Sequence, residues 1–157
     1  MPDGTEPDVA TARVYLRPAA RRDRDEFLER MQESRTLHEP WISPPLTGLA
    51  YQNYLARNQR DDHAGLLVCL RDTDAIAGVI NLNNIVRGTF LSASLGYYAA
   101  SRYAGHGFMR EGLKLATRFA FGTLGLHRLE ANIQPDNHRS IGLVRACGFA
   151  LEGRSPA

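Results

Sequence analysis

Hydrophobic positions in the first part of the chain change their spacing several times, and each change predicts a new element. Residues 14–17 alternate as a short strand that ends at Pro18, and apolar side chains at helical spacing predict helices over 22–32 and 49–58. The segment 38–45 holds three prolines and predicts a loop between these helices. Three strands are predicted next, at 66–71, 76–85 and 90–99. The first part is therefore expected to be a helical pair followed by an antiparallel meander.

The second part contains the longest helical pattern. Residues 107–121 place apolar side chains on one face and basic side chains on the other. Gly112 lies inside this helix, where glycine costs about 1 kcal/mol relative to alanine, so close packing is expected there. A strand at 129–134 and a helix at 137–146 follow, and residues 148–149 could begin another strand. A meander followed by a β-α-β unit predicts one α/β domain of the α+β type, with a mixed central sheet and helices on both faces.

Composition agrees with one folded domain. The chain has 157 residues and a mass of 17.4 kDa, and its 43% hydrophobic and 23% charged residues exclude disorder as the main state. We predict a flexible acidic tail over residues 1–11 and the folded domain over 12–157. No run of about 18 apolar residues is present, and the first residues lack an apolar leader. We therefore expect a cytoplasmic protein with no membrane partner.

Charge and cysteine content narrow the function classes further. The net charge is +2, and the basic residues are scattered arginines, with Lys114 as the single lysine. They form no stripe with aromatic residues or a helix-turn-helix pattern, so we expect no nucleic-acid partner. Cys69 and Cys147 stand among apolar neighbours and are too few for a disulfide framework or a metal cluster. We expect both to be reduced structural residues and no metal to be bound.

One segment has the features of a ligand site. A strand leads into a turn with Gly105 and Gly107, and the long helix begins at once. Glycines allow close backbone approach, and a helix N-terminus offers free N–H groups and a positive dipole end, which suits phosphate or pyrophosphate. Arg102 could add a cation, although a tight turn with a purely structural purpose explains the glycines equally well. No P-loop and no dinucleotide fingerprint is present, which argues against nucleotide hydrolysis and redox chemistry.

The segment Arg102-Tyr103-Ala104-Gly105-His106-Gly107 resembles the Q/R-x-x-G-x-G/A signature of the GNAT (Gcn5-related) N-acetyltransferases. Further likenesses are to the RimJ/RimL branch, which acetylates ribosomal-protein N-termini. They comprise residues 16–18, the Trp41 loop, and residues 78–82, 95–98, 127–131, 137–140, 148–149 and 152–153. The resemblance implies a single GNAT-like domain that uses acetyl-coenzyme A and attacks the thioester directly with an amine, without a covalent enzyme intermediate.

The resemblance also implies where the coenzyme would lie. The pyrophosphate would meet the backbone amides of six consecutive residues, Tyr103, Ala104, Gly105, His106, Gly107 and Phe108, with Arg102 nearby. The pantetheine arm would pair with the strand backbone at Tyr97 and Tyr98, where that strand separates from 129–134. Asn137 would meet the pantetheine or the acyl group.

The catalytic groups are less complete. Many relatives place a tyrosine as thiolate acid where this chain has Val144, so we favour Ser140, one turn after Asn137, with helix capping as the alternative. Relatives often have a glutamate where Ser94 stands. Glu130 is the remaining candidate base, and an exposed or ion-paired strand residue is the other interpretation.

A site that lacks an obvious base favours an amine of low pKa. An α-amine titrates near ~7.8 and lysine near ~10.4, so deprotonation of the α-amine near neutrality costs about 3.5 kcal/mol less. We therefore expect a protein N-terminus, such as that of a ribosomal protein, as acceptor, held by Trp41 and Asn83 between the helical pair and the meander. A purely structural Trp41 packed in the core is an equally good interpretation. A small-molecule amine remains an alternative, as does a non-catalytic relative that binds coenzyme A.

The last residues of the sequence bear on the number of strands in the sheet and on pairing with a second copy. Relatives continue into a final hairpin strand where this sequence ends at residues 151–157, so the last strand is expected to be missing. An open sheet edge would invite pairing with a second copy, which makes a homodimer possible.

Overall fold

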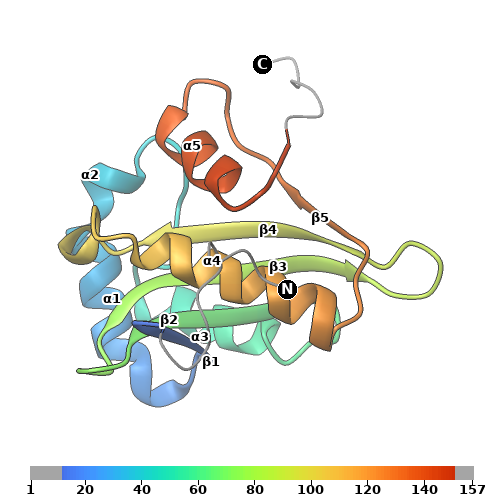
Figure 1. The fold of residues 1–157 in the computed structure, drawn as a ribbon. Helices are drawn as coiled ribbons and strands as arrows, with labels where there is room; N and C mark the ends of the chain where they lie inside the picture. Colours follow the sequence, from blue (N-terminus) through green and yellow to red (C-terminus); the bar gives the residue numbers. More distant parts are fainter. Residues whose placement is uncertain (1–11, 151–157) are drawn as a thin grey trace.

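A five-stranded sheet forms the centre of the molecule, and helices cover both of its faces (Figure 1). The computed structural model describes residues 12–150, so the predicted acidic tail and the predicted end of the sheet at 151–157 lie outside the described residues. The strands are β1 (Val14–Pro18), β2 (Ala64–Leu70), β3 (Ile76–Val86), β4 (Ser92–Ala99) and β5 (Arg128–Ala131). Strands β1 to β4 pair antiparallel in chain order, and β5 pairs parallel to β4. The predicted mixed sheet is confirmed.

The helices divide into a group on each face. They are α1 (Arg24–Glu33), α2 (Arg35–His38), α3 (Gly48–Arg57), α4 (Phe108–Arg118) and α5 (His138–Ala146). Short turns at η1 (Arg21–Asp23), η2 (Ser101–Tyr103) and η3 (Phe119–Thr123) complete the set. Helices α1 and α3 lie behind the sheet and α4 lies in front of it, while α5 sits beside β4 and β5 (Figure 1). No helix within residues 12–150 is long and apolar enough to cross a membrane.

Each face has its own apolar core. Leu113 and Ala116 of α4 are fully buried in the cluster that contains Val68 and Ile80 of the sheet. A Cβ on Gly112 would lie 2.9 Å from a methyl carbon of Val68, which confirms the predicted close packing of α4 on β2. Hydrophobic burial of this extent supplies most of the stability of such a layer.

The opposite face is covered by aromatic side chains. Phe27, Tyr51 and Tyr54 are fully buried against the sheet, and the Phe27 and Tyr51 ring centroids lie 4.8 Å apart. Both cysteines are free thiols, Cys69 buried and Cys147 half-buried.

Several element ends differ from the predictions by one to three residues, and three differences bear on the site. Residue 38, predicted to begin the loop 38–45, is instead the last residue of helix α2. Strand β5 ends at Ala131, three residues before the expected end. Residues 148–150 do not form a strand, because Gly148, at φ +96°, ends α5 in a left-handed turn.

The early end of β5 opens the sheet. Strands β4 and β5 are paired from Ser92 with Arg128 to Leu95 with Ala131, and residues 132–134 then leave the sheet. The β5-facing edge of β4 is therefore unpaired after Leu95. This gap between neighbouring parallel strands positions the site described next.

Candidate active site

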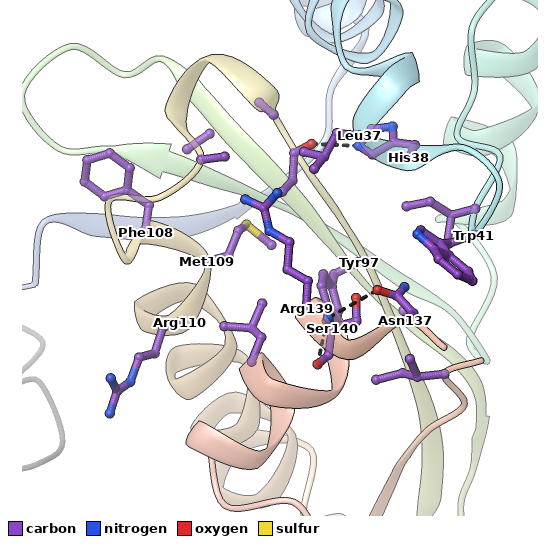
Figure 2. A pocket seen from close by; sticks show the side chains of 18 of the residues that line it. Leu37, His38, Trp41, Tyr97, Phe108, Met109, Arg110, Asn137, Arg139 and Ser140 are labelled. Atoms are coloured by element: carbon purple, nitrogen blue, oxygen red, sulfur yellow. Dashed lines mark hydrogen bonds between the residues drawn. The ribbon is translucent and has the colours of Figure 1, made fainter. Parts of the chain in front are cut away.

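A cavity of about 650 Å³ follows the gap between β4 and β5 (Figure 2). Its walls come from β4, residues 132–134, the first turn of α5, the loop before α4, and the end of α2 with the loop after it. The predicted site residues that line it are Trp41, Tyr97, Tyr103, Ala104, Gly105, Gly107, Phe108, Asn137 and Ser140. Most of the residues chosen from the sequence therefore meet around one volume.

The loop before α4 presents backbone donors to this cavity. Gly105 and Gly107 have φ values of +83° and +80°, which side chains rarely adopt, and Gly107 is the N-cap of α4. Within residues 12–150, the backbone N–H groups of residues 105–110 donate to no other group. The N–H groups of Tyr103 and Ala104 are engaged, because they donate to the carbonyls of Ala100 and Ser101 in η2. The free donors thus begin at Gly105 and extend into the first turn of the helix.

An arginine from the first strand region holds this loop. Arg13 Nη2 donates to the carbonyl of His106 at 2.8 Å, and its guanidinium lies 4.7 Å from the centre of the Phe108 ring. It also forms an ion pair with Glu111 of α4. His106 thus takes part through its backbone carbonyl, and its ring does not line the cavity. Sequence reasoning missed Arg13, because nothing local links it to a loop about ninety residues away.

The first turn of α5 forms the facing wall. Asn137 caps this helix, with its Oδ1 accepting from the backbone N–H of Ser140 at 3.3 Å. The Tyr97 hydroxyl donates to the Ser140 carbonyl at 3.3 Å, which ties α5 to β4. Burial raises the pKa of Tyr97, so its phenol stays protonated near neutrality. The Asn137 cap and the Tyr97 hydrogen bond both use the Ser140 backbone, and the Ser140 side chain also interacts with the Tyr97 phenol, whose pKa it lowers against the larger effect of burial.

Two further arginines line the cavity that sequence reasoning did not select. Arg139 projects from α5 into the cavity, and Arg110 stands on the first turn of α4 (Figure 2). Both side chains are exposed. Helical position alone gave no reason to separate them from the other arginines of this arginine-rich chain.

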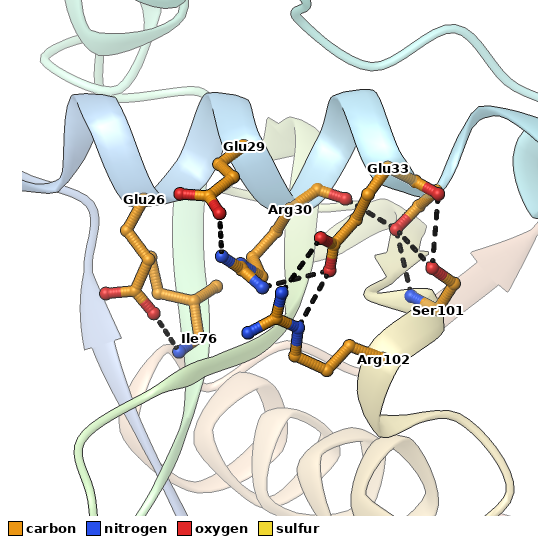
Figure 3. A network of polar contacts seen from close by, with 8 residues as sticks. Glu26, Glu29, Arg30, Glu33, Ile76, Ser101 and Arg102 are labelled. Carbon is orange, nitrogen blue, oxygen red and sulfur yellow. Dashed lines mark hydrogen bonds and ion pairs between the residues drawn. The ribbon is translucent and has the colours of Figure 1, made fainter.

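Arg102 lies outside this cavity. Its Nε and Nη2 each lie 3.2 Å from a carboxylate oxygen of Glu33 at the end of α1, and Glu33 also accepts from Arg30 at 2.9 Å (Figure 3). The neighbouring Ser101 N–H donates to the Ser34 hydroxyl at 2.9 Å. These contacts fasten the loop before α4 to α1.

Tyr98 and Glu130 also point elsewhere. The Tyr98 side chain packs on the opposite face of the sheet, with its ring centroid 6.1 Å from that of His38. Glu130 Oε1 lies 2.8 Å from Nε of Arg128, and its side chain is 48% exposed. Glu130 lines neither of the two cavities described.

His38 is a buried titratable group that sequence reasoning did not select. Its Nε2 lies 2.7 Å from the carbonyl oxygen of Ala99, and its Nδ1 is buried without a partner in residues 12–150. Burial lowers the pKa of this histidine more than the Ala99 contact raises it. The imidazole is therefore neutral near pH 7, and it shares the cavity wall with Trp41.

Asn83 belongs to a second cavity, of about 410 Å³, on the α3 side of the sheet. Asn132, in the segment after β5, lines both cavities. The predicted acceptor residues Trp41 and Asn83 thus lie in neighbouring cavities that share one residue.

The sequence also matches a known protein family. Residues 13–150 match the acetyltransferase (GNAT) domain. The chain belongs to the GNAT acetyltransferase family. The larger cavity of this GNAT domain is surrounded by three features: the gap in the central sheet, the glycine loop and the N-terminus of α4.

Curated relatives of this GNAT domain differ in the acceptor that their names state. The ribosomal protein uS5-alanine N-acetyltransferase of Escherichia coli is 42% identical over 82 residues, which make up 52% of this chain and 42% of that protein. The spermidine N(1)-acetyltransferase of Vibrio cholerae is 24% identical over 131 residues, 81% of this chain and 73% of that protein. The match to the uS5 enzyme therefore spans less than half of that protein's length.

Among solved structures, Mycobacterium smegmatis RimJ in complex with CoA-disulfide has a TM-score of 0.79 and is 25% identical, with 89% of this chain and 71% of that chain covered. The GNAT fold expected from the sequence is therefore confirmed, and so is the acetyltransferase class.

Proposed function

We propose that this GNAT acetyltransferase transfers the acetyl group of acetyl-CoA to the α-amine of a protein N-terminus, such as that of a ribosomal protein. One observation carries the donor half of this proposal. Six consecutive backbone N–H groups without partners in residues 12–150 stand at the start of α4, beside a cavity that continues along the gap between β4 and β5. Such a helix N-terminus binds phosphate groups through its free donors and its dipole.

The cavity walls fit the successive parts of the coenzyme. The pyrophosphate would accept from the amides of Gly105 to Phe108, with Met109 and Arg110 extending the row, while Tyr103 and Ala104 shape the wall. Arg139, which projects into the cavity, is better placed than the ion-paired Arg102 to add a positive charge. The pantetheine amides would pair with the open edge of β4 at Tyr97 and Tyr98. The Asn137 side chain stands at the far wall.

The chemistry then requires a polarised carbonyl and a proton for the departing thiolate. Backbone N–H groups on the open edge of β4 near Tyr97 would polarise the thioester carbonyl. The Ser140 hydroxyl, which belongs to the cavity wall, would donate to the sulfur. The acceptor amine attacks the carbonyl carbon, the C–S bond breaks, and the thiolate takes a proton through the Ser140 hydroxyl. The serine is reprotonated from solvent, which also takes the proton that the amine loses.

The acceptor half of the proposal rests on two arguments. The uS5-alanine enzyme, with 42% identity over its matched segment, is named for an alanine of ribosomal protein uS5. In addition, Glu130 lines neither cavity, and the carboxylates that do, Glu39 and Asp62, pair with Arg35 and Arg60. A site without a free carboxylate favours an α-amine, which needs the weakest base. A polyamine is the second candidate, because the spermidine enzyme matches 81% of this chain.

The test uses purified protein and acetyl-CoA. Release of free thiol is followed with a peptide pool that begins with alanine or serine, with spermidine, and with a peptide blocked at its N-terminus but containing lysine. We expect turnover with the free N-termini and little with the other two acceptors. Preference for spermidine would replace the proposed acceptor, and stabilisation by acetyl-CoA without thiol release would indicate a relative that only binds the coenzyme.

A substitution tests the coenzyme site directly. Gly107→Val should abolish the rise in melting temperature that acetyl-CoA produces, because valine is strained at φ +80° and its Cβ would approach Arg13. Gly122→Ala, where a Cβ would meet nothing within 4 Å, is the matched control. Equal coenzyme affinity in both variants would place the pyrophosphate elsewhere.

A further inference from the structure

The second cavity is lined only by polar and charged residues. It lies between the end of α3, the outer end of β3, the start of β4 and the segment after β5. Asn83 and Ser94 are opposite each other in the β3–β4 pair, and both line the cavity. This composition is unlike that of the larger cavity, whose wall includes Leu95, Tyr97 and Phe108.

The two cavities meet at the gap in the sheet. Asn132 lines both, and Gly96, two residues after Ser94 on β4, lines the larger one. Side chains alternate along a strand, so Ser94 and Gly96 face the α3 side while Leu95 and Tyr97 face α5. A molecule whose amine reaches the gap from the α3 side therefore has the rest of its length in or beside the second cavity.

The second cavity has an excess of positive charge. Arg60 and Asp62 neutralise each other, with Nη2 and Oδ2 2.7 Å apart. Arg57, at the end of α3, stacks on the Tyr54 ring at 5.7 Å and has no carboxylate partner within residues 12–150. The wall therefore has no unpaired carboxylate to bind an ammonium group, and it has one guanidinium free to bind an anion.

Its uncharged groups can both donate and accept hydrogen bonds. The amides of Asn83 and Asn132 offer both functions, which matches peptide backbone with its one donor and one acceptor per residue. His63 is buried, and its Nδ1 has no partner in the described residues. A protonated polyamine offers donors alone, and its charges would be repelled by Arg57.

We propose that the second cavity holds the residues that follow the acceptor amine, and that Arg57 selects peptides with a carboxylate in their first positions over polyamines. This inference rests on the proposed function, since it concerns the acceptor of the same reaction. Guanidinium–carboxylate contacts are charge-assisted and geometrically specific, whereas like charges brought together lower affinity.

The test compares kcat/KM for three acceptors: a peptide with alanine first and glutamate third, the same peptide with lysine third, and spermidine. For the unmodified protein we expect the acidic peptide to exceed the basic one by about tenfold, the size of one charge-assisted contact. Arg57→Glu should reverse the order of the two peptides and raise the relative rate with spermidine. Arg21→Glu, at an exposed arginine of η1, should leave all ratios unchanged.

The outcomes separate this inference from the proposed function. Both Arg57→Glu and Arg21→Glu should keep the acetyl-CoA shift in melting temperature, which shows that fold and donor site are intact. Turnover of both peptides at equal rates, or an Arg57→Glu variant with the original ratio, overturns the assignment of Arg57 while leaving N-terminal acetylation in place. No turnover of either peptide, with acetylation of spermidine, overturns both.

Discussion

Burial of His38 links the protonation of one side chain to stability. Its pKa in the folded protein lies below the ordinary value of 6.5, chiefly because of desolvation. The unfolded chain therefore binds a proton at this residue more readily than the folded chain does. The contribution of the neutral ring to the free energy of unfolding is therefore fully present above pH 6.5. It is lost as the pH falls through the lowered pKa of the folded protein.

The expected result is a free energy of unfolding that falls from pH 7 towards pH 5, with His38 contributing at most about 1.4 kcal/mol per pH unit. Urea unfolding at several pH values measures the slope. His38→Gln should be less stable at pH 7 but less sensitive to acid, because glutamine does not titrate. Parallel pH profiles for the two proteins would show that the ring does not titrate differently on folding.

Ser140 and Glu130 give a matched pair of substitutions for the chemical step. Ser140→Ala should lower kcat by about 10²-fold with little change in the KM for acetyl-CoA, because a proton donor is lost and the cap by Asn137 stays. Glu130→Gln should keep nearly full activity, since its carboxylate pairs with Arg128 outside both cavities. Thiol-release kinetics measure both, and a large loss in the glutamine variant would restore Glu130 as the base.

Helix α4 packs closely on the sheet because Gly112 has no side chain. Alanine there would gain about 1 kcal/mol of helix propensity but would force a Cβ to 2.9 Å from Val68, and overpacking of this kind costs about 1–3 kcal/mol. We expect Gly112→Ala to lower the melting temperature. Gly142→Ala in α5, where a Cβ would meet nothing within 4 Å, should hold or raise it. An equal change in both would mean that packing against β2 does not limit residue 112.

The elements themselves were largely predictable, because each rests on a local pattern. Alternation predicted the strands, helical spacing predicted α1, α3, α4 and α5, and the glycine loop marked the start of α4. The parts that the sequence did not predict depend on contacts between distant segments. Arg13 meets His106 and Glu111, and Arg102 meets Glu33, across 69 to 98 residues of chain. No local spacing distinguishes these arginines from the others.

The end of β5 and the short helix α2 escaped prediction for a similar reason. Residues 132–134 have a sequence compatible with a strand, but they leave the sheet where the cavity opens. Helix α2 has four residues, too few for a periodic pattern to be recognised. Local patterns in the sequence thus predict which elements form, whereas tertiary contacts decide where they end.

The contacts of Glu33 join the helical half of the molecule to the half that would bind the coenzyme (Figure 3). Glu33 accepts from the buried Arg30 and from Arg102, next to the loop before α4. Glu33→Gln should therefore destabilise the fold by about 1–3 kcal/mol, since Arg30 loses a charged partner in a buried position. It should also weaken acetyl-CoA binding, because Arg102 no longer fastens the loop to α1.

The control for this coupling is Asp25→Asn, which removes an exposed pair with Arg24 at 3.2 Å outside both cavities and should change stability by less than about 0.5 kcal/mol. Thermal unfolding with and without acetyl-CoA separates the two effects, because a ligand stabilises the folded state according to its affinity and concentration. If Glu33→Gln lowers the melting temperature but keeps the full acetyl-CoA shift, the network stabilises the fold without positioning the loop. A reduced shift, with Asp25→Asn unchanged, is the result expected when α1 holds the loop in its binding geometry.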